Sequence, residues 1–152
     1  MLPVGALKQD YGKDNRTHFT HEEQRTMMTL WCMMSSPLMV GAHLPASDDF
    51  TLSLLKNEGL LKCLKDGYCG HSLYRNENEA VWIKPEMNGE GIWLAAFNLS
   101  GNERQIHISL PFGEKQQFTQ QNELWSDLHQ TYTGKFDVTV HAHDAVIWYI
   151  TQ

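Results

Sequence analysis

The chain has 152 residues, 41% of them hydrophobic and 20% charged, which suits a globular protein with one good core or two small ones. The net charge of −6, with no cluster of Lys and Arg, excludes nucleic-acid binding, which needs a basic surface; a neutral polar ligand is compatible. No apolar run approaches the ~20 residues that span a bilayer, and no signal segment opens the chain, so no membrane partner is expected.

In chain order, the first expected element is the end of a buried strand, at Leu2-Pro3-Val4-Gly5. A helix is expected over 21–34, because Thr20 and Glu23 have the spacing of a capping box. Its apolar stripe has helical spacing and comprises Met27, Met28, Leu30, Trp31 and Met34. Pro37 ends the helical pattern.

The run 37–42 is short, apolar and without alternation, which predicts a strand buried on both faces. Asp48 or Asp49 then caps a second helix over 50–56, and Asn57 can cap a further short helix that continues to Leu64. The order helix, buried strand, helix is typical of a parallel α/β unit. One or two such strands do not make a complete sheet, so we expect the rest of that sheet to lie outside this sequence.

The second half of the chain has the period of strands, at 79–86, 91–99, 103–110, 122–127, 135–143 and 145–151. Asn88-Gly89 and Ser100-Gly101-Asn102 are typical of hairpin turns. The strands over 92–99 and 145–150 are apolar on both faces and should be central or covered. Together these strands predict an antiparallel sandwich, with the boundary between the halves near 65–72. We expect 70–152 to be the independently stable portion.

Several stretches resemble one known family. "MLPVG", "THFTHEEQRTMMTLWCMMSSPLMVGAHL" and "FTLSLLKNEGLL" are similar to the C-terminal part of the melibiase-type α-galactosidases. "AVWIKP" and "GIWLAAFNLS" resemble the first strands of that family's β-domain, and "ELWSDL" and "HAHDAVIWYI" resemble its closing strands. The resemblance implies a mixed α and β fold. Residues 1–68 would form the last βα units of a (β/α)8 barrel, and residues 69–152 would form a C-terminal antiparallel β-sandwich.

The resemblance also implies the chemistry of the intact enzyme, which hydrolyses terminal α-galactosides with retention. Two Asp carboxylates act at the ends of central barrel strands, and no cofactor or metal is needed because the carboxylates supply the acid, base and nucleophile. Those strands precede the family's Asp-Met-Leu motif, of which this sequence has Met1-Leu2. We therefore expect no catalytic residue in this chain. Met1 carries over as a residue that lines the galactose pocket, and His43 stands where relatives often have Asp or Asn.

Two other functions are compatible with the residues. The β-half could be a non-catalytic carbohydrate-binding module, if solvent-facing aromatic rings stack on sugars; the candidates are Trp82, Trp93, Trp125, Tyr132 and Trp148. The chain could instead be purely structural and associate with a missing barrel segment or with itself. That reading predicts an exposed apolar patch formed by Met27, Leu30, Trp31 and Met34.

Cysteine and histidine give little support for a metal site. The cysteines are Cys32, Cys63 and Cys69, and the last two could form a disulfide, although no Cys-x-x-Cys motif is present. His18 and His21 flank a helix start. His141 and His143 are predicted on the solvent face of one strand, where both could reach one ion, but no third ligand is apparent.

Overall fold

The structure is a computed structural model that describes residues 1–7, 15–89, 91–110, 120–126, 129–130 and 135–151. The helices are α1 (His21–Met33), the short 3-10 helix η1 (Leu44–Ala46), α2 (Asp49–Lys56) and α3 (Glu58–Lys65). The strands are β1 (His71–Arg75), β2 (Glu79–Pro85), β3 (Gly91–Asn98), β4 (Arg104–Ser109), β5 (Gln120–Glu123), β6 (His129–Gln130), β7 (Lys135–Val140) and β8 (Ala145–Thr151). The helices of these ranges include none that is long and apolar enough to cross a membrane.

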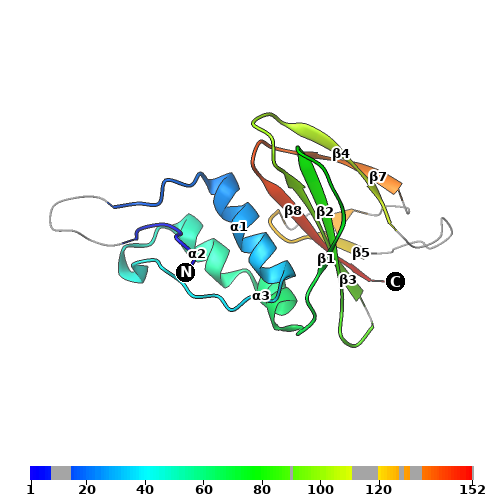
Figure 1. Cartoon of the computed structure of the whole chain (residues 1–152). Coiled ribbons are helices and arrows are strands. Elements are labelled where there is room, and N and C mark those ends of the chain that lie inside the picture. Colours follow the sequence, from blue (N-terminus) through cyan, green and yellow to red (C-terminus); the bar gives the residue numbers. More distant parts are fainter. Residues whose placement is uncertain (8–14, 90, 111–119, 127–128, 131–134, 152) are drawn as a thin grey trace.

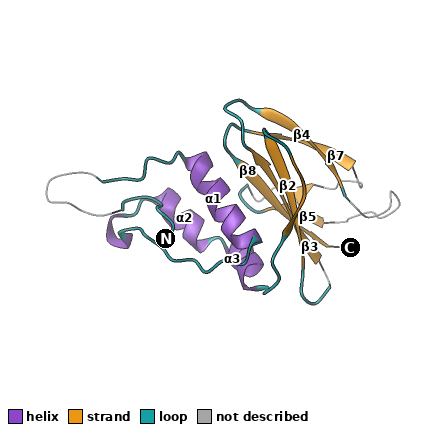
Figure 2. Cartoon of the chain, viewed as in Figure 1, coloured by secondary structure: helices purple, strands orange, loops and turns teal. Residues whose placement is uncertain are grey.

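The fold has three layers, with the helices on one face of a large sheet and a small sheet on its other face (Figure 1). The large sheet has six strands in the order β1-β2-β3-β8-β5-β6, and β4 pairs with β7 in the small sheet. All of the strand pairs are antiparallel, which confirms a mixed fold with antiparallel sheets (Figure 2).

The two central strands of the large sheet, β3 and β8, are apolar on both faces because a hydrophobic core lies on each side of the sheet. Toward the helices, one cluster includes Met28, Cys32, Leu54, Leu60, Trp93, Ala95, Phe97 and Ile147. Toward the small sheet, the other cluster includes Leu94, Ala96, Ile106, Ile108, Phe136, Trp148 and Ile150. The core therefore continues from the helices, through the large sheet, to the small sheet.

Local signals set the helix starts as predicted. Thr20 and Glu23 form the complete capping box of α1. Asp48 caps α2 by accepting a hydrogen bond from the Thr51 N–H, and Asn57 caps α3 in the same way through the Leu60 N–H. In each case a side-chain oxygen satisfies a backbone donor that has no partner inside the helix.

Two predictions about the first half are wrong. Residues 37–42 are not a strand buried on both faces, because they form a single bridge in which Val40 pairs with Leu2 in parallel, and the Met39 side chain is 63% exposed. The exposed patch that the purely structural alternative predicted on α1 is also absent. Met27, Leu30 and Trp31 pack against the core toward the sheet, because the β-half covers that face of the helix. Met34, just after the helix, is exposed.

The second half departs from the sequence prediction mainly at its connections. The Asn88-Gly89 turn joins β2 to β3 as expected, with Gly89 at φ +75°. The turn at 100–102 is not a hairpin, since it carries the chain from β3 in the large sheet to β4 in the small one. Strand β1 was not predicted. The predicted strand over 135–143 ends at Val140, and β5 ends at Glu123, before a turn.

The three cysteines are free, so the disulfide that the spacing left open does not form. Cys32 and Cys63 are buried where α1 and α3 pack together, and burial raises the pKa of each thiol to about 12. They act as small apolar side chains in the core, as predicted for Cys32.

Candidate functional site

Met1 and His43 lie on two short extended stretches that run side by side. The Leu2 N–H donates to the Met39 carbonyl at 2.7 Å, and the Gly41 N–H donates to the Leu2 carbonyl at 2.9 Å. These two bonds flank the parallel bridge between Leu2 and Val40. We call the stretches 1–4 and 37–43 the parallel pair.

Met1 is 82% exposed and lies beside a glycine of the neighbouring stretch. A Cβ on Gly41 would be 3.4 Å from the Met1 Cβ and 3.1 Å from the Leu2 carbonyl oxygen. The absence of a side chain at Gly41 therefore lets the two stretches approach closely.

His43 closes the carboxyl end of the parallel pair. Its N–H donates to the Ala6 carbonyl at 2.6 Å, and the chain then turns into η1. The imidazole is half-buried, and its Nδ1 has no hydrogen-bond partner among the residues that the structure describes. A buried ring nitrogen of this kind can accept or donate a hydrogen bond to a ligand.

A glycine and a buried amide hold the parallel pair on the helices. Gly5 has φ +60°, and its N–H donates to Gln24 Oε1 of α1 at 3.2 Å. A Cβ on Gly5 would overlap the Thr51 side chain of α2. Only glycine combines this backbone conformation with such close packing, so the sequence fixes where the stretch 1–4 leaves the helical layer.

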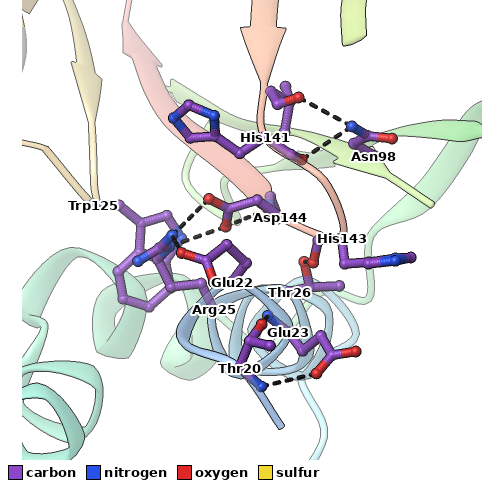
Figure 3. Close-up of polar contacts among 12 residues, drawn as sticks. Thr20, Glu22, Glu23, Arg25, Thr26, Asn98, Trp125, His141, His143 and Asp144 are labelled. Carbon is purple, nitrogen blue, oxygen red and sulfur yellow. Dashed lines mark hydrogen bonds and ion pairs between the residues drawn. The ribbon is translucent and has the colours of Figure 1, made fainter. Parts of the chain in front are cut away.

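A second polar cluster joins α1 to the turn between β7 and β8 (Figure 3). Arg25 donates from Nε and Nη2 to the two carboxylate oxygens of Asp144, at 2.9 and 2.6 Å, and also contacts Glu22 at 3.0 Å. Thr26 Oγ1 donates to the His143 carbonyl at 2.8 Å. The hydrogen bond to Asp144 raises the pKa of Arg25, and the contact between the two side chains is bidentate.

A buried lysine makes another connection between the halves. Lys84 of β2 is fully buried, and its Nζ donates to the Cys32 carbonyl at 3.3 Å, to Ser35 Oγ at 2.7 Å and to the Cys63 carbonyl. The two carbonyls lie in the last turns of α1 and α3, where the helix dipoles favour a cation. We call this arrangement the Lys84 clamp.

Comparisons with known proteins give a consistent result, although no family model matches the chain. The chain is 27% identical to α-galactosidase 3 of Arabidopsis thaliana over 87% of its own length and 32% of the relative's. It is 29% identical to α-galactosidase D of Emericella nidulans, over 84% of the chain and 20% of the relative.

One solved structure matches nearly the whole chain. It is a variant of the GH27 β-L-arabinopyranosidase of Geobacillus stearothermophilus in complex with arabinose, with a TM-score of 0.88 and 32% identity over 99% of this chain and 36% of that one. The chain matches a C-terminal part of the α-galactosidase family. It spans about a third or less of the length of these relatives.

Three carboxylates of this chain, Glu22, Asp48 and Glu86, already have partners. Glu86 accepts a hydrogen bond from the Tyr149 hydroxyl at 2.6 Å and forms an ion pair with Lys62 at 2.9 Å. Burial of the Glu86 carboxyl raises its pKa, but the contacts with Tyr149 and Lys62 outweigh burial and hold the pKa below its usual value. Hydrogen bonds from backbone amides lower the pKa of Glu22 and of Asp48. A general acid in a glycosidase needs a raised pKa, which none of these three carboxyls has.

The aromatic side chains do not form the exposed platform that a carbohydrate-binding module would need. Trp93 and Trp148 are buried, and Trp82 and Trp125 are partly buried against the core. Trp125 Nε1 donates to Thr29 of α1. Tyr132, the fifth candidate, lies outside the described residues. The comparisons give no support to this alternative.

The histidines of the sequence-based metal hypothesis do not converge. His141 follows the end of β7 and contacts Glu103 at 2.9 Å, whereas His143 has φ +56° in the turn before β8. They therefore do not share the face of one strand. Within the described ranges, no three side chains of His, Cys, Asp or Glu are grouped to hold a metal ion.

The sequence did not predict the two connections between the halves. Arg25 and Asp144 are 119 positions apart, and nothing near either residue indicates the other. Lys84 gave a weak signal, because it directly follows the apolar run Ala80–Ile83 within the same strand. A lysine in such a run predicts a buried cation with nearby acceptors.

Proposed function

We propose that this chain is the C-terminal part of an α-galactosidase-type glycoside hydrolase and that the intact enzyme hydrolyses terminal α-galactosides with retention of configuration. The observation that carries the proposal is the match of almost the entire chain to about a third of a GH27 glycosidase. The relatives with curated names are α-galactosidases, which favours an α-galactoside as substrate.

We assign residues 1–68 to the last βα units of a (β/α)8 barrel and residues 69–152 to the β-sandwich domain. The parallel bridge between Leu2 and Val40, with α1 between the two stretches in sequence, supports a βαβ connection. The antiparallel sheets of the second segment support a separate architecture there. The two segments share one core, so the role of the β-sandwich is to cover the outside of the barrel helices.

The catalytic carboxylates would come from barrel strands outside residues 1–152. A retaining glycosidase needs two carboxyl groups ~5–5.5 Å apart across the scissile bond. The partners described above leave Glu22, Asp48 and Glu86 unsuited to either role. The chain alone should therefore be inactive, and its natural partner would be the preceding barrel segment. No cofactor is required by this chemistry.

Met1 and His43 are the residues of this chain that we place at the sugar. In a barrel enzyme the site lies at the carboxyl ends of the strands. His43 follows the second stretch of the parallel pair at that end, and its Nδ1 has no hydrogen-bond partner among the described residues. Met1 supplies exposed apolar surface for the face of a sugar ring.

The decisive experiment compares this chain with the same chain fused behind the remaining barrel of a relative. Both are assayed on an aryl α-D-galactopyranoside and on an aryl β-L-arabinopyranoside, which has the same ring stereochemistry without the hydroxymethyl group. We expect no turnover by the chain alone and turnover of the galactoside by the fusion. Turnover by the chain alone would refute the proposal. Fusion activity on the arabinoside only would correct the substrate.

A further inference from the structure

A cleft of about 580 Å³ lies beside β7, where the small sheet leaves part of the large sheet without a covering strand. The described strands form a small sheet of two and a large sheet of six, so β4 and β7 cannot extend over the whole face (Figure 1). Ligand sites in proteins have volumes of roughly 300–1,000 Å³. Among the described residues, the lining comes from the β-half and from Arg25 of α1, and the parallel pair contributes none of it.

The edge of β7 forms one wall of the cleft. Residues 137–141 line it consecutively, although successive side chains of a strand point to opposite faces. A consecutive run lines a cavity along the edge of a strand, so the backbone groups of β7 that do not bind β4 are directed into the cleft. The Thr139 hydroxyl has no hydrogen-bond partner among the described residues, and Asp137 uses one of its oxygens for His107. The wall therefore offers both donors and acceptors to a ligand.

Apolar side chains form the floor of the cleft. Val138 of β7 and Val146 of β8 pack on the core between the two sheets, yet both are only partly buried, because the cleft reaches them. Trp148, which is buried on the same face of β8, extends this apolar surface. An apolar floor beside a polar wall suits a sugar ring, because such a ring has an apolar face of C–H groups and a polar edge of hydroxyls.

Charge narrows the class of ligand to neutral molecules. The carboxylates of Glu123, Asp137 and Asp144 line the cleft and repel an anion. A cation gains little, because Arg25 already binds both oxygens of Asp144 (Figure 3) and three backbone N–H groups donate to Glu123. Arg25 Nη1 donates to no described residue, so it can donate to a hydroxyl of a ligand.

We propose that this cleft binds a neutral saccharide. One sugar ring lies with its apolar face on Val138 and Val146. Its hydroxyls bind the β7 edge, the Thr139 hydroxyl and Arg25 Nη1. The cleft is separate from the sugar site proposed at the parallel pair, and it differs from an exposed aromatic platform because a strand edge and aliphatic side chains hold the ring. The cleft itself indicates a neutral sugar, whereas the expectation of galactose rests on the proposed function.

The test is an NMR titration of the isotope-labelled full chain with three methyl α-D-glycopyranosides. The galactoside and the glucoside are neutral and differ in configuration at one carbon, and the galacturonide carries a carboxylate. We expect the galactoside to bind with a Kd of about 1–10 mM and to shift the amide signals of Thr139 and Val146 saturably. The galacturonide should bind at least about 5-fold more weakly, because three carboxylates line the cleft.

Two substitutions should weaken the binding of the neutral sugar, each with a matched control. Val146→Trp fills the cleft and should weaken binding at least about 10-fold, whereas Ile92→Trp, at a partly buried position of the same core that does not line the cleft, should not. Thr139→Val removes one hydrogen bond and should weaken binding about 3–10-fold, whereas Gln105→Val, opposite Thr139 on β4, should have no effect. The amide spectrum of each variant shows whether it is folded.

The absence of a saturable shift with both neutral sugars would overturn the proposal, as would binding that neither Val146→Trp nor Thr139→Val weakens. Tighter binding of the galacturonide would overturn the assignment of a neutral ligand. Shifts confined to the parallel pair would place the sugar there and would also overturn the cleft. Binding of the glucoside in the cleft, as tightly as the galactoside or more so, would support the cleft and remove its link to galactose, so the cleft and the proposed function can fail separately.

Discussion

Replacing Lys84 by Met tests whether the buried cation holds the helices on the large sheet. The side chain is fully buried, and methionine matches its length without the charge. Hydrogen bonds from a charged donor contribute about 1.5–3 kcal/mol each, and a buried acceptor left without a partner costs about 1–3 kcal/mol. The substitution removes three such bonds, but it also removes the cost of burying an ammonium group.

The two backbone carbonyls of the Lys84 clamp differ in the hydrogen bond that each keeps after the substitution. The Cys32 carbonyl keeps a hydrogen bond from the Ser35 N–H at 3.1 Å, whereas the Cys63 carbonyl keeps one from the Asp66 N–H at 3.4 Å. The Cys63 carbonyl and the Ser35 hydroxyl therefore carry most of the loss. The variant no longer has the desolvation cost of a buried ammonium group, and this gain offsets part of the loss. We therefore expect Lys84→Met to lower the free energy of unfolding by about 3 kcal/mol.

Urea denaturation followed by tryptophan fluorescence measures this change, which corresponds to a fall in Tm of about 6–12 °C for a chain of this size. Lys65→Met is the matched control, because Lys65 is exposed in the last turn of α3 and should change the free energy of unfolding by less than about 0.5 kcal/mol. A Lys84→Met chain as stable as the unmutated one, or more stable, would show that desolvation outweighs the three hydrogen bonds. The clamp would then be a net cost to the fold.

Three further measurements test the remaining contacts. A double-mutant cycle with Arg25→Met and Asp144→Asn should give a coupling free energy of about 1.5–3 kcal/mol, and a value near zero would show that α1 does not depend on this ion pair. Because the folded-state pKa of Glu86 is lowered, the ionised carboxylate stabilises the fold at neutral pH, and this stabilisation is lost as the pH falls below about 4.3. In urea titrations, Glu86→Gln should therefore lose stability less steeply than the unmutated chain between about pH 5 and 3. An unchanged slope would contradict this. Gly89→Ala should cost about 1 kcal/mol for its positive φ alone, while Gly5→Ala should cost at least about 2 kcal/mol because its Cβ would also overlap α2; equal losses by thermal denaturation would refute the packing argument.

Features that depend on a few neighbouring residues were predictable from the sequence. The capping box at Thr20 and the caps at Asp48 and Asn57 follow from side chains within three residues of the amide they bind. The two covered faces of β3 follow from its unbroken apolar run. Each of these signals lies within a few residues of the feature that it determines.

Features that depend on a distant partner were not predictable. Residues 37–42 have the composition of a buried strand, yet the burial of such a run depends on what packs against it. Among the described residues, Leu2 alone forms a β-bridge with it. On α1 the β-half covers the face that the purely structural alternative predicted to be exposed. The Arg25–Asp144 pair and the Lys84 clamp likewise join residues from opposite halves of the chain. Sequence periodicity gives the face that is apolar, but not the surface that covers it.

The large sheet explains why the two halves of this chain behave as one structure. Along β3 the side chains alternate, so that Trp93 and Ala95 face the helices while Leu94 and Ala96 face the small sheet. Removing the helices would leave the first of these faces without cover, and an apolar face of a six-stranded sheet in water promotes association. The independent stability that we expected of residues 70–152 would therefore require another surface on that face. The polar contacts made by Arg25 and Lys84 lie where α1 meets this sheet, and they fix the orientation of a contact that is otherwise non-directional.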